Sequence, residues 1–195
     1  LETHKRYGKL SLKQILHPVI SQAKKGIYVS YDLNQAIGSA DQIKLDDESK
    51  NIYYQNDVPL MENELVKRTG LAWALNEIAN NGQEAFYSGS ISKKIVKAMK
   101  QNNGYISAED LKNYKPRFSE PIHTTYRNYK IFAHPPPAGG AAVLLEGLNI
   151  IENFETNDLG PNSADFIHIF AEALQRGHMD RSRFMGDPLF YDVPI

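Results

Sequence analysis

Three consecutive prolines constrain this chain more than any other part of its sequence. Residues 133–154 read AHPPPAGGAAVLLEGLNIIENF. The segment opens with three prolines and two glycines, Pro135, Pro136, Pro137, Gly139 and Gly140. Each proline fixes φ at about −65° and removes a backbone donor, which predicts a stiff, extended stretch. The glycines lead into a predicted helix whose apolar side carries Leu144, Leu148 and Ile151.

Two functions are open for this proline-glycine segment. The backbone amides of Gly139, Gly140 and Ala141 would lie at a helix N-terminus, where an anionic group can bind. Alternatively, the prolines end an edge strand, and the glycines let the helix pack closely against it. The local sequence supports both interpretations.

Composition describes an ordinary globular chain of 195 residues, 42 % hydrophobic and 23 % charged, and we expect residues 1–195 to form one domain portion. A net charge of −1 provides no field that would recruit nucleic acid. The absence of cysteine excludes disulfides and thiolate metal sites. No apolar run approaches the ~18 residues that a membrane helix needs. The chain opens without an initiator methionine, and we interpret it as a processed product or a fragment.

Hydrophobic periodicity predicts helices over residues 11–26, 62–81 and 91–100, a short one at AEDLKNY, and a long one from Ser163. Ser11 and Gln14 have the spacing of a capping box, and Ser107 and Asp110 are expected to cap the short helix. Pro18 predicts a break near His17, which would then lie at a helix end. Trp73 is expected to be partly buried.

Residues 27–59 are the least informative part of the sequence. IYVSYDL fits either a short strand or the start of a helix. The acidic residues Asp46, Asp47 and Glu48 lack the alternating oxygen ligands and glycine turn of a calcium loop, so we interpret them as a solvated loop.

The period changes to two at residues 121–133, which predicts a β-hairpin with a turn at Arg127 and Asn128. The long final helix then carries a polar stripe spaced at three or four residues: His168, Glu172, Arg176, Asp180 and Arg183. Such a stripe indicates a solvated face with ion pairs, or a buried polar network that fixes the helix. A metal site is not favoured, because HIFAE lacks the HExxH arrangement.

The chain shows no complete active site. No GxSxG motif is present, and without cysteine no Cys-His pair can form. His123, Thr124 and Thr125 stand together, but they lie in a predicted strand without a free amine to act as base. We interpret them as hairpin residues.

The order of the segments resembles the γ-glutamyltranspeptidase family of the N-terminal-nucleophile hydrolases. The resemblance rests on YGKLSL with HPVISQAKKGIYV, and then on the run LVKRTGLAWALNEIANNGQEAFYSGSISKKIVKAMKQNNGYISAEDLKNY. The hairpin with its prolines and LLEGLNIIENF follow, and finally EALQRGHMDRSRFMGDPLF. Apart from residues 27–59, these stretches cover nearly the whole chain.

The resemblance implies an α+β fold, a mainly helical portion of an αββα sandwich with one β-hairpin. It also implies a precursor that cleaves itself into a large and a small subunit, with a threonine of the small subunit as nucleophile. The γ-glutamyl group of glutathione or a similar donor would pass to that threonine and then to water or an acceptor amine. No cofactor, metal, nucleic acid or membrane span is implied, and an exported location is expected.

This chain corresponds to the later part of the large subunit, before the nucleophile. We therefore assign no catalytic or substrate-binding residue to it. Structural candidates are Pro135, Pro136, Pro137, Gly139, Gly140, Glu172, Asp180, Arg181, Gly186 and Asp187. The family usually reads PPPSSGG where this chain has PPPAGG, Lys67 replaces a frequent glutamine, and Gly70 replaces a polar residue.

Three hypotheses follow from the resemblance. The chain is scaffold and pocket wall of a γ-glutamyltransferase or glutathione hydrolase, with the small subunit as its partner. Alternatively, the parent is an acylase acting on cephalosporins or poly-γ-glutamate, or a non-catalytic binding homologue. The proline-glycine segment is interpreted as a structural hinge for its helix, and Gly140→Val is expected to damage folding or maturation of the full-length protein before it alters donor choice.

Overall fold

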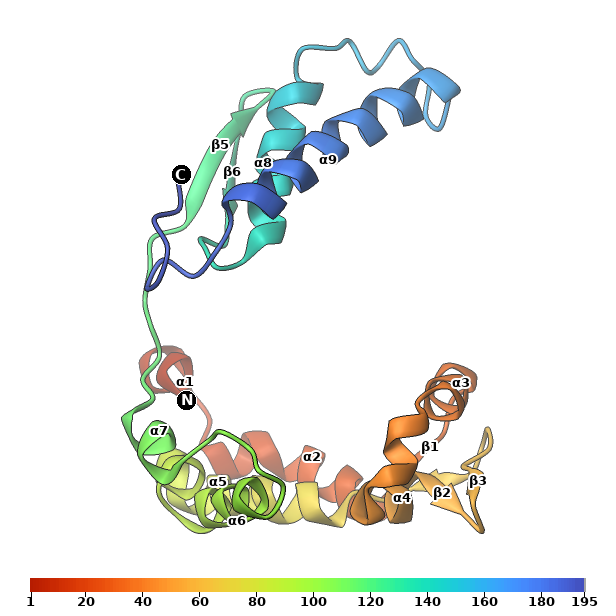
Figure 1. Cartoon of the computed structure of the whole chain (residues 1–195), viewed down its shortest axis with the longest axis vertical. Coiled ribbons are helices and arrows are strands. Elements are labelled where there is room, and N and C mark those ends of the chain that lie inside the picture. Colours follow the sequence, from red (N-terminus) through yellow and green to blue (C-terminus); the bar gives the residue numbers. More distant parts are fainter. Residues whose placement is uncertain (195) are drawn as a thin grey trace. The chain divides into compact units, whose positions relative to one another are not determined.

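Residues 1–194 are described by the structure, a computed structural model, and they form two compact units. Unit 1 spans Leu1–Pro116, and unit 2 begins at Arg117. Each unit has its own packed elements (Figure 1). That residues 1–195 are one portion of a single larger domain stays a prediction.

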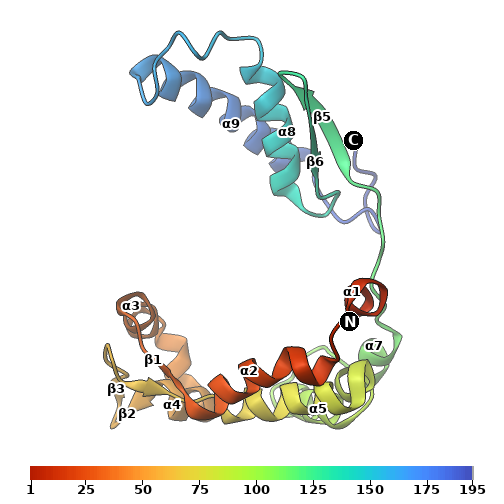
Figure 2. The same cartoon turned by 180° about the vertical axis from the view of Figure 1, so that it is seen from behind.

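Unit 1 is mainly a layer of helices. The helices of this layer are α1 (Glu2–Tyr7), α2 (Leu12–Lys25), α5 (Thr69–Tyr87), α6 (Ser90–Gln101) and α7 (Ala108–Asn113). Helix α2 packs along α5, and α6 packs against both α5 and α7; Figure 2 shows α2 and α5 side by side. The predicted capping boxes at Ser11 and Ser107 are both confirmed. Trp73 is partly buried, as expected.

A second cluster of unit 1 is built from residues 27–66. Its elements are β1 (Ile27–Tyr28), α3 (Tyr31–Ser39), the 3₁₀ helix η1 (Asp41–Leu45), α4 (Asp47–Tyr53), β2 (Tyr54–Gln55), β3 (Val58–Pro59) and β4 (Leu65–Val66). Val29, Leu60 and Val66 form its buried core. Strand β1 pairs with β4, and β2 pairs with β3, both antiparallel.

The predicted helix over residues 62–81 is wrong at its start. Leu65 and Val66 pair with β1 as strand β4, and Val66 is buried in the core, so non-local pairing overrides local helical periodicity there. Helix α5 starts at Thr69 and runs to Tyr87. Gly82 has non-helical backbone angles, φ of 62° and ψ of −147°, so α5 consists of two helical stretches joined at a kink, and the predicted end at Asn81 coincides with the end of the first stretch.

The predicted break at Pro18 is also wrong. Helix α2 continues through Pro18, and His17 lies in the middle of the helix rather than at its end. Proline removes the hydrogen bond to the carbonyl of Gln14, but both residues are exposed, so water can satisfy that carbonyl. Packing of α2 along α5 holds the rest of the helix in place.

Two further expectations for residues 27–59 are corrected. Asp46 is the N-cap of α4 and accepts a hydrogen bond from the Ser49 amide at 2.7 Å, so Asp47 and Glu48 begin a helix and are not part of a solvated loop. Carboxylates at the N-cap and in the first turn stabilise a helix, because they interact favourably with the positive end of its dipole. The strands β2 and β3 form a hairpin, so the chain has more than the one hairpin expected.

Unit 2 consists of a hairpin and two helices in sequence. Its elements are β5 (Ile122–Tyr126), β6 (Tyr129–Ala133), α8 (Gly139–Ile151) and α9 (Ala164–Phe184). The predicted hairpin is confirmed, with Arg127 and Asn128 at positive φ in its turn. The predicted start of the last helix is confirmed by Ser163, which caps the Phe166 amide.

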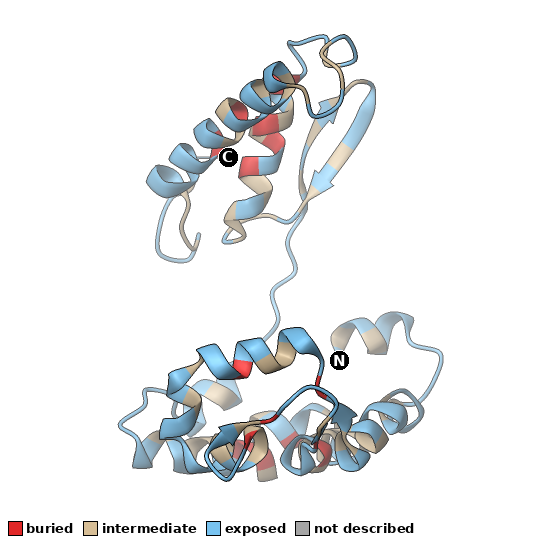
Figure 3. Cartoon of the chain, turned by 90° about the vertical axis from the view of Figure 1, so that its right-hand side faces the viewer, coloured by how far each residue is buried: buried red, intermediate tan, exposed pale blue. Residues whose placement is uncertain are grey.

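Helix α8 packs against the hairpin on one side and against α9 on the other (Figure 1). Its buried residues are Val143, Leu145, Gly147 and Ile151, shown in red in Figure 3 with the other buried positions. Leu144 was expected on the buried side but is 47 % exposed, whereas its neighbours Val143 and Leu145 are buried. Together the two units are helical with small antiparallel sheets, which is an α+β composition.

Candidate functional site

The three prolines connect β6 to α8, and they turn the chain rather than extending it. The peptide bond between Pro136 and Pro137 is cis, and the two residues lie in a turn. The Ala138 amide donates to the Pro135 carbonyl at 3.3 Å, which closes the turn. The expected extended stretch is therefore wrong for Pro136 and Pro137.

Two open hollows lie beside these prolines in unit 2. Pro135 lines one of about 400 Å³, together with Arg117, Phe132, His134 and others. Pro136 lines another of about 520 Å³, between the start of the hairpin and the Pro188–Val193 segment. The turn thus brings adjacent prolines to the walls of separate hollows.

The two glycines of the segment have different surroundings. A Cβ built on Gly139 would lie 2.6 Å from Nε of Arg181, so the Arg181 side chain on α9 passes directly over this glycine. Nothing lies within 4 Å of a Cβ on Gly140. The expected damage from Gly140→Val therefore has no steric support at this position, and Gly139 is the glycine with the close neighbour.

Helices α8 and α9 come close together at a residue that sequence reasoning did not single out. Gly177 is buried, and a Cβ added to it would lie 3.0 Å from Cα and 3.1 Å from the carbonyl oxygen of Val143. A backbone neighbour cannot move aside as a side chain can. Gly177 therefore fixes the distance between the two helices of unit 2.

The polar stripe of α9 is mainly exposed, as in the solvated-face interpretation. Nη1 of Arg176 lies 2.8 Å from Oε2 of Glu172, four residues earlier on the helix. The hydrogen bond from Arg176 lowers the pKa of Glu172 below its usual value. His168, Asp180 and Arg183 are exposed members of the same stripe.

Glu146 on α8 is a half-buried acid that the sequence analysis overlooked. Burial raises its pKa above the usual value, and the negative charge of Asp180 on α9 raises it further. The Glu146 carboxyl on α8 is thus influenced by a charge on α9. No pattern in the sequence pairs these positions, since they come from different elements.

Asp187 joins the start of unit 2 to its end. Its carboxylate accepts a hydrogen bond from the Leu189 amide at 3.0 Å, within the turn after Gly186. The same carboxylate lies 3.3 Å from Nη1 of Arg117, 70 residues earlier in the chain. The Leu189 amide and the Arg117 guanidinium hold the pKa of Asp187 below its usual range, against an opposing effect of partial burial.

Among the described residues, His, Cys, Asp and Glu side chains nowhere gather in threes around a possible metal position. None of the described helices combines the length and apolar character required to cross a bilayer. The residues named above hold their neighbours by packing and ion pairing. They do not form a nucleophile with a base.

Comparison with known proteins relates the whole chain to one family. The family model described as Gamma-glutamyltranspeptidase matches residues 1–195. A glutathione hydrolase proenzyme of Escherichia coli (strain K12) is 35 % identical over 97 % of this chain. An acylase proenzyme, ACY 1 of Pseudomonas sp. (strain SE83), is 32 % identical over 97 % of it.

A solved structure, that of Helicobacter pylori γ-glutamyltranspeptidase, matches 99 % of this chain with a TM-score of 0.93 and 34 % sequence identity. The chain covers 56 % of that structure's chain and 33 % of the Escherichia coli relative. It thus spans about a third of the length of such curated relatives. On the match of the family model over every residue, the chain belongs to the γ-glutamyltranspeptidase family.

Proposed function

We propose that this chain is the later part of the large subunit of a γ-glutamyltransferase or glutathione hydrolase. The observation that carries the proposal is the match along the entire chain to proteins named glutathione hydrolase proenzyme and γ-glutamyltranspeptidase. In the proposed reaction, a threonine hydroxyl outside this chain attacks the γ-glutamyl carbonyl. The donor amine leaves with a proton, and water or an acceptor amine then releases the γ-glutamyl group from the threonine ester.

The role proposed for this chain is scaffold and pocket wall. Its support lies in the proline segment, where Pro135 and Pro136 line separate open hollows and Gly139 seats α8 beneath Arg181. The described residues line these hollows with both apolar and polar side chains. They supply no base oriented toward a nucleophile.

The proposed partner is a small subunit cut from the same precursor, in a complete αββα sandwich. The relatives' designation as proenzymes supports a cleaved precursor. The hairpin of unit 2 supports a larger sheet, since within the described chain β5 and β6 pair only with each other. The hairpin also exposes Phe132 and Tyr129, by 60 % and 73 %. The chain expressed alone is therefore expected to self-associate, and a concentration-independent monomer with a cooperative melt would argue against this.

The proposal is tested by assaying γ-glutamyl-p-nitroanilide with the protein in its full natural length and with the 195-residue chain alone. The full-length protein is expected to release nitroaniline and to show two bands on a denaturing gel. The chain alone is expected to be inactive. Appreciable turnover by the chain alone would refute the scaffold role, and an inactive full-length protein lacking a downstream threonine would favour a binding homologue.

A related acylase is the second candidate, supported by the 32 % identity to an acylase proenzyme and by PPPAGG at the hollows. A competition between glutathione and glutaryl-7-aminocephalosporanic acid as donors separates the two candidates. Preference for the cephalosporin would replace the first candidate with the second. An exported location is proposed on family membership alone, and fractionation of the source cells tests it.

A further inference from the structure

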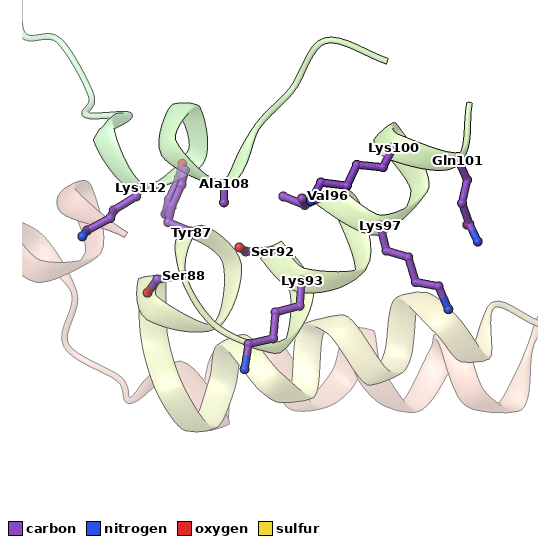
Figure 4. Close-up of a pocket in the computed structure, with 10 residues that line it drawn as sticks. All are labelled: Tyr87, Ser88, Ser92, Lys93, Val96, Lys97, Lys100, Gln101, Ala108 and Lys112. Atoms are coloured by element: carbon purple, nitrogen blue, oxygen red, sulfur yellow. The ribbon is translucent and has the colours of Figure 1, made fainter. Parts of the chain in front are cut away.

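An open hollow in unit 1 has an apolar lining and a rim of lysines. It lies between the end of α5, the outer side of α6 and the start of α7, with a volume of about 640 Å³. This volume is within the range of about 300–1,000 Å³ found for small-molecule sites. Its lining residues are Tyr87, Ser88, Ser92, Lys93, Val96, Lys97, Lys100, Gln101, Ala108 and Lys112 (Figure 4).

The lysines of this lysine-rimmed hollow carry unneutralised charge. Four of the ten lining residues are lysines and none is acidic. Within the described residues, none of the four takes part in an ion pair. By contrast, Lys94 on the same helix lies over the Trp73 ring, 4.9 Å from its centroid, and does not line the hollow.

Ser92 is the observation that distinguishes this hollow from an ordinary solvated lysine face. The residue is only 5 % exposed and lines the hollow. Among the described residues, no buried side-chain oxygen or nitrogen lacks a hydrogen-bond partner, so the Ser92 hydroxyl, which makes no hydrogen bond to the protein, is open to the water of the hollow. Ser88 differs, because its hydroxyl donates to the Glu84 carbonyl at 3.3 Å.

The apolar part of the hollow is held by fixed neighbours. The ring of Tyr87 stacks on that of Tyr114, with centroids 5.6 Å apart and an angle of 10° between the planes. Figure 4 shows Lys100 running toward Val96, while Lys93 and Lys97 extend away from that space. Lys100 is therefore the cation best placed to meet a ligand that lies on Val96 and Ala108.

We propose that the lysine-rimmed hollow binds a small amphipathic carboxylate. Its apolar body lies against Tyr87, Val96 and Ala108, its carboxylate meets Lys100, and the Ser92 hydroxyl donates a hydrogen bond to it. A polyanion would use the lysines without needing the apolar lining or Ser92. An uncharged apolar molecule would leave both the lysine and the hydroxyl unused.

The probe for the test is 2-naphthoate, which is fluorescent and combines an apolar body with a carboxylate. The full-length natural protein is titrated with 2-naphthoate, with the uncharged isostere 2-naphthamide, and with acetate. For about 13 non-hydrogen atoms, a dissociation constant on the order of 1 mM or tighter is expected for 2-naphthoate. 2-Naphthamide should bind at least about 3-fold more weakly, in keeping with the loss of one charged contact, and acetate not detectably.

Variants then locate the site. Lys100→Gln should weaken 2-naphthoate by about 3- to 5-fold and leave 2-naphthamide unchanged, as expected for one exposed charge pair. Ser92→Ala should weaken 2-naphthoate by a similar factor, and Ala108→Trp should abolish binding of both by filling the hollow. Lys94→Gln is the matched control, because it removes the same charge from the same helix outside the hollow.

The expected pattern requires each variant to keep the parent circular dichroism spectrum and melting temperature. No binding of 2-naphthoate, or equal binding of 2-naphthamide, overturns the proposal. Equal weakening by Lys94→Gln and Lys100→Gln also overturns it, since that result describes a diffuse positive field. Retained binding in Ala108→Trp would place the ligand elsewhere and overturns the proposal as well.

Discussion

Arg117 and Asp187 are 70 residues apart, yet their side chains meet within unit 2. Sequence analysis selected Asp187 from its motif but could not supply its partner, since no local spacing relates the two. Both side chains are partly exposed, so this ion pair adds modestly to stability. Its value lies in tying the start of unit 2 to the segment after α9.

The pH dependence of this contact follows from the lowered pKa of Asp187. A carboxyl whose folded pKa lies below its unfolded value stabilises the fold above about pH 4, and this stability is lost as pH falls through the folded pKa. Asp187→Asn should therefore lower the melting temperature slightly at pH 7 and leave it nearly unchanged at pH 3. Calorimetry at both pH values measures this, and Asp192→Asn, which alters a nearby exposed acid, is the control. If Asp187→Asn lowered the melting temperature equally at both pH values, the loss would come from the introduced amide group and not from the missing charge.

Glu146 should behave in the opposite sense. Burial and the charge of Asp180 raise its pKa, so its favourable contribution is present below its unfolded pKa, about 4.3, and is lost as pH rises through the folded pKa. Glu146→Gln should thus raise the melting temperature at pH 7 and have little effect at pH 3.

Asp180→Asn provides the matched test of the cause. At pH 7, Glu146→Gln should raise the melting temperature less in a protein that already carries Asp180→Asn than in the parent protein. Additive effects would mean that burial alone is responsible for the raised pKa of Glu146.

Short-range signals predicted the helix starts of this chain well. Ser11, Ser107 and Ser163 each cap a helix as their spacing indicated, because a cap is decided by residues within one turn. The errors occur where distant residues decide. Val66 pairs with strand β1 and is therefore a strand residue, although local periodicity predicted a helix. Helix α2 continues past Pro18 because it packs along α5.

In the candidate site, too, local features were predicted from the sequence and features set by tertiary packing were not. The sequence located the proline segment and the start of the following helix, but not which glycine has a close neighbour. Arg181 lies over Gly139 and leaves Gly140 open, a distinction made only by packing between α8 and α9. Gly177 was missed for the same reason, since a glycine within a polar helix has no signal of its own.

At the scale of elements, the contact of Gly177 with Val143 predicts a large effect from one methyl group. Gly177→Ala should destabilise unit 2 by about 1–3 kcal/mol, because the new Cβ meets backbone atoms that cannot move without separating α8 from α9. Chemical denaturation measures the change in free energy of unfolding. Gly140→Ala is the control and should be neutral or slightly stabilising, since its Cβ enters open space in a helix. Equal losses in both variants would contradict the packing argument.

At the scale of the whole molecule, the two units have separate cores: Val29, Leu60 and Val66 in unit 1, and the α8–α9 interface in unit 2. Loss of packing in one core should therefore leave local opening of the other unchanged. In hydrogen exchange, Gly177→Ala should speed exchange of the amides of α8 and α9 but not those of α2 and α5. Equal acceleration in both units would show that they unfold together.

The stretch that joins the two units has a practical consequence for anyone who purifies this protein. Residues 114–121 are exposed throughout and belong to no helix or strand. Exposed chain of this kind is where proteases cut first. Trypsin cleaves poorly before proline, so Pro116 shields Lys115, and the bond after Arg117 becomes the preferred point of nicking. The Asp187 carboxylate that holds Arg117 thereby also guards the connection against digestion.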